Sequence, residues 1–153
     1  MRGVIVLLLA ALAAATDVQA GTADNVRTAK RVLLQLMGEG RLERPGRTFG
    51  PNFVAHAASA NHTLQQDLAS TQSWRAAMPD LKVTIERTVA GEDMVAVHWL
   101  AKGTNTVATG EMPGKGDPLG IEGMTIFRFE AGRIVEEWSV LDVAALRKVF
   151  DRR

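Results

Sequence analysis

The chemistry that this sequence could support centres on one carboxylate, Asp142, which follows a predicted strand over residues 133–141. A carboxyl group at the wall of an apolar cavity is poorly solvated and can hold a proton near neutral pH. It could then exchange that proton with a carbon acid or a carbonyl group. Asp142 also directly precedes a predicted helix, where aspartate is a preferred N-cap. Both the acid/base and the capping interpretation stay open from the residues alone.

His56 is the second candidate, because it ends a short apolar segment over residues 51–56. It could polarise a carbonyl group or share a proton with Asp142, or it could be a loop histidine bonded to the backbone. His62 and His98 are expected at the surface. The three histidines lack metal-ligand spacing, and the chain contains no nucleophile elbow, Walker loop or dinucleotide motif. We therefore predict neither a metal site nor a cofactor.

Aromatic and polar side chains are predicted to bind a flat, apolar ligand, namely Trp74, Trp99, Thr125, Phe127 and Trp138. Plain core packing is the alternative for the tryptophans. Side chains alternate across a strand. If no bulge intervenes, one face of the segment 133–142 therefore carries Ile134, Glu136, Trp138, Val140 and Asp142. An aromatic ring and a carboxylate are therefore expected to leave the same, inward side of the sheet.

The elements that must position these side chains follow from local patterns. Residues 124–129 and 133–141 form a predicted hairpin whose turn contains Gly132. Helices are predicted over about residues 25–37, after a Thr63-x-x-Gln66 capping box as far as Pro79, and over residues 143–150. Alternating strands are predicted over residues 81–86 and 95–102, and residues 110–120 read as an irregular loop. Helices followed by antiparallel strands predict an α+β domain with helices on one sheet face.

Length and composition limit the function classes. The chain has 153 residues, enough for one domain, and a formal net charge of +1, which argues against a nucleic-acid partner. Without cysteine, thiolate metal sites and cysteine nucleophiles are excluded. Arg2, an apolar run over residues 4–15 and the small-residue pattern at 18–20 predict a signal peptide over residues 1–20 and a mature domain over residues 21–153. We expect a periplasmic or secreted protein that does not bind a membrane after cleavage.

Several segments together resemble a known family: Pro-Asn-Phe-Val-Ala-His at 51–56, Val-Ala-Val-His-Trp at 95–99, Gly-Met-Thr-Ile-Phe-Arg-Phe at 123–129 and Gly-Arg-Ile-Val-Glu-Glu-Trp at 132–138. Nearly the whole mature chain is similar to the SnoaL-like polyketide cyclases of the nuclear transport factor 2-like superfamily. The resemblance implies a cone-shaped roll, with N-terminal helices packed into the concave face of a curved, mostly antiparallel sheet and a pocket inside. It also implies homodimers, a catalytic role for Asp142 and a pocket position for His56. Apolar residues 32–34 and Thr125 depart from the family's usual residues.

These observations predict an exported domain that binds a small apolar molecule with a carbonyl group. If it is an enzyme, we expect a cofactor-independent isomerase or cyclase, or a related lyase or hydrolase, in which Asp142 acts as general acid/base and His56 assists. Two alternatives stay open. One is a non-catalytic protein that only binds the ligand, and the other is a structural dimerisation module of the same fold.

Overall fold

The computed structural model describes residues 21–57, 60–110, 112–142, 144, 146 and 147. The predicted signal peptide lies outside the described residues. Of the predicted helix over residues 143–150, only Ala144, Leu146 and Arg147 are described, and these three are helical. No helix in the described part of the chain is long and apolar enough to cross a bilayer.

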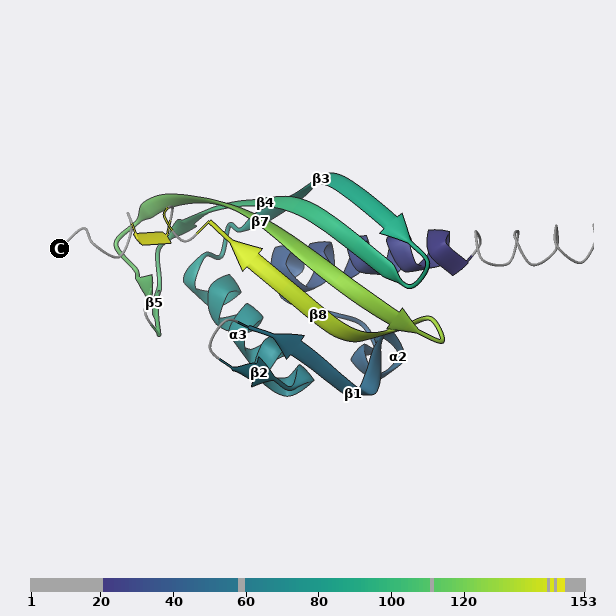
Figure 1. Cartoon of the computed structure of the whole chain (residues 1–153). Helices are drawn as coiled ribbons and strands as arrows, with labels where there is room; N and C mark the ends of the chain where they lie inside the picture. Colours follow the sequence, from purple (N-terminus) through teal and green to yellow (C-terminus); the bar gives the residue numbers. More distant parts are fainter. Residues whose placement is uncertain (1–20, 58–59, 111, 143, 145, 148–153) are drawn as a thin grey trace, which may run out of the picture.

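A six-stranded sheet forms one layer of the molecule, with the spatial order β2-β1-β8-β7-β4-β3 (Figure 1). The strands are β1 (Phe49–His56), β2 (Asn61–His62), β3 (Lys82–Gly91), β4 (Met94–Asn105), β7 (Asp117–Glu130) and β8 (Arg133–Leu141). Neighbouring strands are antiparallel except β1 and β8, which are parallel. The short strands β5 (Ala108–Thr109) and β6 (Met112–Pro113) form a separate pair. The loop predicted over residues 110–120 therefore contains β6 and the start of β7.

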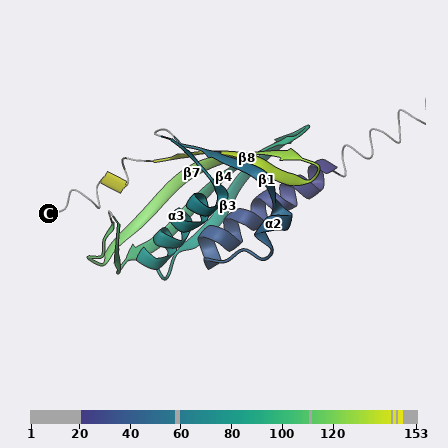
Figure 2. The same cartoon turned by 90° about the horizontal axis from the view of Figure 1, so that it is seen from below.

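Helices cover one face of this sheet and leave the other face open (Figures 1 and 2). Residues 21–32 form an α-helix that continues into the π-helix η1 (Leu33–Glu39), and Gly40 ends it with a φ of 71°. A single turn, α2 (Pro45–Thr48), and the longer helix α3 (Leu64–Ala77) follow. The predicted capping box is confirmed, because Thr63 and Gln66 satisfy each other's backbone N–H groups at the start of α3. The curved α+β architecture agrees with the predicted fold class.

The hydrophobic core lies between the helices and the covered sheet face. The largest fully buried apolar side chains are those of Trp99, Phe49, Phe127, Met78, Ile121 and Ile134. Every second residue of β7 from Leu119 to Phe129 points into this core, whereas the residues between them face outward or lie at the surface. This alternation is typical of a sheet with one covered face.

A β-bulge in β8 changes which side chains reach the core. Phe129 of β7 pairs with Ile134, but its neighbour Arg128 pairs with Glu136, so Val135 is an extra residue without a partner on β7. On the other side of β8, Gly50 of β1 makes room for it, since a Cβ atom at Gly50 would lie 2.9 Å from Val135 Cγ1. Beyond the bulge the alternation of β8 is shifted by one residue.

Candidate functional site

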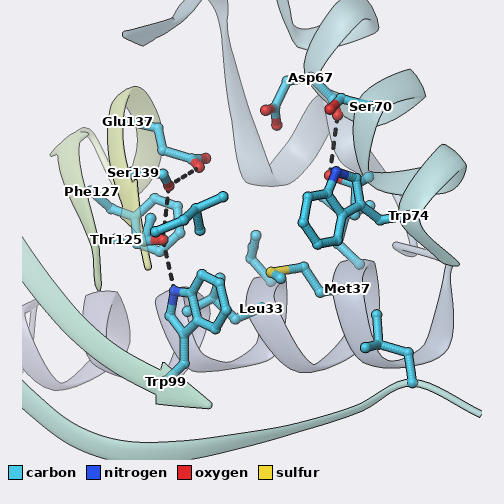
Figure 3. A pocket seen from close by; sticks show the side chains of 15 residues that line it. Leu33, Met37, Asp67, Ser70, Trp74, Trp99, Thr125, Phe127, Glu137 and Ser139 are labelled. Carbon is cyan, nitrogen blue, oxygen red and sulfur yellow. Dashed lines mark hydrogen bonds between the residues drawn. The ribbon is translucent and has the colours of Figure 1, made fainter. Parts of the chain in front are cut away.

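A cavity of about 150 Å³ lies between the helices and the covered sheet face (Figure 3). Its apolar walls come from η1, α3 and the strands β4, β7 and β8. Fifteen residues line it, namely Val32, Leu33, Leu36, Met37, Asp67, Ser70, Thr71, Trp74, Leu81, Trp99, Thr125, Phe127, Glu137, Ser139 and Leu141. Single-turn π-helical segments often occur at functional sites, and here the π-helical stretch supplies Leu33, Leu36 and Met37 to the wall.

Two carboxylic acids enter this cavity from opposite layers. Glu137 comes from β8 and Asp67 from α3, and Figure 3 shows both side chains pointing into the space between the layers. Burial, together with the nearby charge of Asp67, raises the pKa of Glu137 to about 8. Burial also raises the pKa of Asp67, and the charge of His62 partly opposes this rise. The charge of Asp67 therefore adds to burial in favouring the protonated form of Glu137.

Hydrogen bonds hold the Glu137 carboxyl in place. Glu137 Oε1 accepts a hydrogen bond from the Ser139 hydroxyl at 2.9 Å. Ser139 Oγ in turn lies 2.8 Å from Thr125 Oγ1, to which the indole N–H of Trp99 donates at 3.0 Å. The hydrogen bond from Ser139 lowers the pKa of Glu137, so it opposes the effect of burial.

Four of the side chains predicted to contact a ligand line this cavity: Trp74, Trp99, Thr125 and Phe127. Trp99, Thr125 and Phe127 are almost fully buried, while Trp74 is partly exposed. The structure therefore brings together aromatic and hydroxyl groups that lie far apart in the sequence. Whether they bind a ligand stays a prediction.

The predicted inward face of β8 is wrong beyond the bulge. Trp138 and Glu136 lie on the open face of the sheet, because the extra residue Val135 shifts the alternation by one. His56 lies there too, with its ring stacked on that of Trp138 at a centroid distance of 4.6 Å. His56 Nε2 is 3.1 Å from Glu136 Oε1, and the other carboxylate oxygen of Glu136 pairs with Arg128. These contacts with Arg128 and then His56 lower the pKa of Glu136.

Asp142 lies just beyond the end of β8, with an exposed side chain that is not part of the cavity wall. Its Oδ1 accepts a hydrogen bond from the backbone N–H of Ala144 at 3.0 Å, a contact typical of a helix N-cap. His56 and Asp142 are therefore not brought together at the cavity. A catalytic role for Asp142 stays a prediction.

The two cavity carboxylates were missed from the sequence. Glu137 was missed because a period of two puts Glu136 inward in its place, and only the bulge reverses them. One clue was available, since two consecutive glutamates place a carboxylate on the inner face in either register. Asp67 sits near the N-terminus of α3, where an acidic residue is ordinarily explained by the helix dipole.

Within the described ranges, no three His, Asp or Glu side chains come together in a way that could hold a metal ion. The functional groups of the site are instead the two carboxyls, the hydroxyls of Thr125 and Ser139, and the surrounding aromatic rings. This set can bind an apolar molecule, orient one polar group on it and exchange protons with it.

Comparisons with known proteins agree with this architecture. The model of the SnoaL-like polyketide cyclase family matches residues 27–148. AclR from Streptomyces galilaeus, for which a hydroxylase activity has been suggested, superposes with a TM-score of 0.74 at 19% identity, over 86% of this chain and 83% of that one. A SnoaL-like protein from Jannaschia sp. CCS1 has a TM-score of 0.69 at 20% identity, over 86% and 94%. IdmH from Streptomyces antibioticus, suggested to be a polyketide cyclase, has a TM-score of 0.67 at 23% identity, over 81% and 98%. No curated protein matches in sequence.

Proposed function

Because this chain belongs to the SnoaL-like polyketide cyclase family, we propose that its cavity binds a small apolar carbonyl compound and that Glu137 and Asp67 exchange protons with it. The observation that carries this proposal is the raised pKa of Glu137, about 8, in an apolar cavity opposite a second carboxyl group. A carboxylic acid that keeps its proton at neutral pH can donate it to a carbonyl oxygen. A nearby carboxylate can accept a proton from the adjacent carbon.

The size of the cavity limits the ligand. A volume of about 150 Å³ suits a single six-membered ring, since an apolar cavity of about that size holds benzene in an engineered protein. Trp74, Trp99 and Phe127 offer flat surfaces for such a ring. A larger polycyclic ligand would require the helices and the sheet to separate, or would leave most of its rings outside the mouth near Ser139 and Leu141, whose side chains are exposed.

The proposed step conserves charge within the site. The Asp67 carboxylate removes a proton from the carbon next to the carbonyl group, while Glu137 donates its proton to the carbonyl oxygen. The products are an enol, a neutral Asp67 and an ionised Glu137, so the pair carries one negative charge before and after. In a ketone that carries a β,γ double bond the enol is a dienol, and return of the Asp67 proton to its γ-carbon, with the enol proton going back to Glu137, shifts the double bond and gives an isomerisation. Attack of the enol carbon on a second carbonyl group gives an aldol-type cyclisation.

The test uses cyclohexanone as the probe, because it combines one ring with one carbonyl group. Exchange of its α-hydrogens for deuterium in D₂O can be followed by ¹H NMR, with and without the protein. We expect the protein to accelerate this exchange, Glu137→Gln to reduce the acceleration by two or more orders of magnitude, and Glu136→Gln, on the opposite face, to retain it. Loss of exchange in Asp142→Asn with retention in Glu137→Gln would instead assign the chemistry to Asp142.

The same experiment separates the alternatives. Shifts of cavity resonances without any exchange would indicate a non-catalytic ligand-binding protein. A purely structural module predicts a cone filled by its own side chains, which the cavity of about 150 Å³ opposes. If the protein neither binds cyclohexanone or similar ring ketones nor accelerates their exchange, the proposed function is refuted.

We further propose that the protein is exported and that it dimerises through the open face of the sheet. Export is supported by the sequence of residues 1–20, and N-terminal sequencing of protein from its native host should begin at Gly21. Full-length chain in the cytosol would contradict export.

Dimerisation is supported by Met124 and Val140, which pair across β7 and β8 and are 43% and 67% exposed. Light scattering should report a dimer that Val140→Glu converts to a monomer, and a monomeric parent protein would contradict it.

A further inference from the structure

A chain of hydrogen bonds connects the interior of the cavity wall to its mouth (Figure 3). It begins at the indole N–H of Trp99, passes through the hydroxyls of Thr125 and Ser139, and ends on Oε1 of Glu137, with donor–acceptor distances of 3.0, 2.8 and 2.9 Å. Trp99 and Thr125 are each only 1% exposed, whereas Ser139 is exposed. The chain therefore has one end fixed in the core and the other at a titratable group.

The buried end sets the direction of the chain. An indole N–H can only donate, so the Thr125 oxygen accepts that hydrogen and keeps its own hydroxyl hydrogen to donate. Ser139 Oγ is the side-chain acceptor that the described residues offer it. Ser139 then donates to Glu137. The reverse order would leave the buried Thr125 hydroxyl hydrogen without an acceptor, which is costly in a dry interior.

We infer that Trp99, Thr125 and Ser139 orient the Glu137 carboxyl so that Oε1 always accepts a hydrogen bond and Oε2 is the oxygen that carries and exchanges the proton. The orientation is a property of the free protein, and its chemical use rests on the function proposed above. The three side chains are positioning residues. They act on the reaction through Glu137.

Gly123 explains how the indole N–H of Trp99 reaches the hydroxyl of Thr125. A Cβ atom at this position would lie 2.4 Å from Cζ2 of Trp99, well inside any normal contact. Without a side chain at Gly123, the indole ring lies directly over the β7 backbone two residues before Thr125. A glycine followed at the second residue by a threonine, on the same face of one strand, thus places the N–H of Trp99 beside a hydroxyl acceptor.

The groups that face Glu137 allow the effect of the hydrogen-bond chain to be measured in the titration of Glu137. From α3 the titratable neighbour is Asp67, on which His62 acts in turn. The residues that η1 supplies to the cavity wall are apolar, and those from β4 and β7 are aromatic or hydroxyl-bearing. Substitutions in the chain leave Asp67 and His62 in place. A change in the titration of Glu137 would therefore report the loss of the hydrogen bond.

The test is a ¹³C NMR titration of the Glu137 side-chain carboxyl between pH 5 and 10 in the mature chain, with Glu137→Gln to assign the resonance. In Ser139→Ala the midpoint should rise by about one pH unit, because the ionised form loses a hydrogen bond. Thr125→Val should raise it by a smaller amount. Thr125→Ser, which keeps the hydroxyl, should restore the parent midpoint. Ser139 is exposed, so its replacement should not prevent folding.

Two outcomes would overturn the inference. If Ser139→Ala leaves the midpoint of Glu137 unchanged, the serine does not act on the carboxyl. If Thr125→Val lowers the melting temperature but leaves the midpoint of Glu137 unchanged, Thr125 serves only to satisfy the N–H of Trp99. The cyclohexanone exchange assay separates the orientation of Glu137 from the proposed function. If the midpoints shift as expected but the protein does not accelerate exchange, only the proposed function is refuted. If the protein accelerates exchange but the midpoint of Glu137 is unchanged in Ser139→Ala and Thr125→Val, only the orientation is refuted.

Discussion

Glu137→Gln should make the protein more stable at high pH, although it removes a charged side chain from the candidate site. The pKa of Glu137 is raised from its ordinary 4.5 to about 8. Between these values the folded protein binds a proton that the unfolded chain has lost, so the free energy of unfolding falls as the pH rises. The destabilisation is absent below about pH 4.5 and complete above about pH 8. Glutamine carries no charge at any of these pH values, so Glu137→Gln removes this destabilisation.

The size of the effect follows from the same numbers. Each pH unit of difference corresponds to about 1.4 kcal/mol, so the interval from 4.5 to about 8 sets an upper limit of about 5 kcal/mol. Glu137 is only partly buried and lies beside the exposed Ser139, so solvent screening reduces this limit, and we expect about 2 kcal/mol at pH 9. At pH 5 the variant and the parent protein should be close in stability. The assay is urea unfolding at pH 5, 6, 7, 8 and 9.

Glu136→Gln is the matched control, because the neighbouring glutamate lies on the other face. Arg128 and then His56 lower the pKa of Glu136, so its carboxylate stabilises the fold above its ordinary pKa, and this contribution is lost as the pH falls. Glu136→Gln should therefore lose stability at pH 7 to 9 and approach the parent protein at low pH. If the two variants show the same pH dependence, or if Glu137→Gln runs parallel to the parent protein, the assignment of the two faces is wrong.

Four further substitutions test packing and local structure by thermal or urea unfolding. Gly123→Ala should cost about 1–3 kcal/mol, because its Cβ would lie 2.4 Å from the ring of Trp99; an unchanged melting temperature would contradict this close approach. Trp99→Ala should cost about 3–5 kcal/mol and Trp138→Ala clearly less, since the first ring is 1% exposed and the second is only partly buried. Equal losses would contradict the placement of Trp138 on the open face. Thr63→Ala should cost about 1 kcal/mol through loss of the capping box, and no loss would mean that the cap is redundant.

Much of this fold follows from local patterns. The capping box at Thr63, the glycine-terminated first helix and the alternating strands each have a short-range physical cause, and the structure contains all of them. Strand ends were less predictable. β7 begins at Asp117, inside a stretch with Pro118 and Gly120 that reads as a loop, because pairing with β4 extends the strand beyond its intrinsic preference.

The wall residues Trp99, Thr125 and Phe127 were also predictable, because β4 and the inner face of β7 alternate without interruption in that region. The cavity between the layers was not. Its existence depends on how closely α3 and η1 approach the sheet, and a single sequence carries no direct record of that distance. Asp67 could therefore be placed on a helix but not opposite Glu137.

The choice of carboxylate depended on one inserted residue. In a regular hairpin Val135 would lie opposite Arg128, and Glu136 would face the core. The bulge instead places Glu136 opposite Arg128, where the two form an ion pair on the open face, and Gly50 leaves space for Val135. The outward charges thus favour the same register that sends Glu137 inward. Arg128 pairs with Glu136 on the open face, and among the described side chains that line the cavity with Glu137 none is basic.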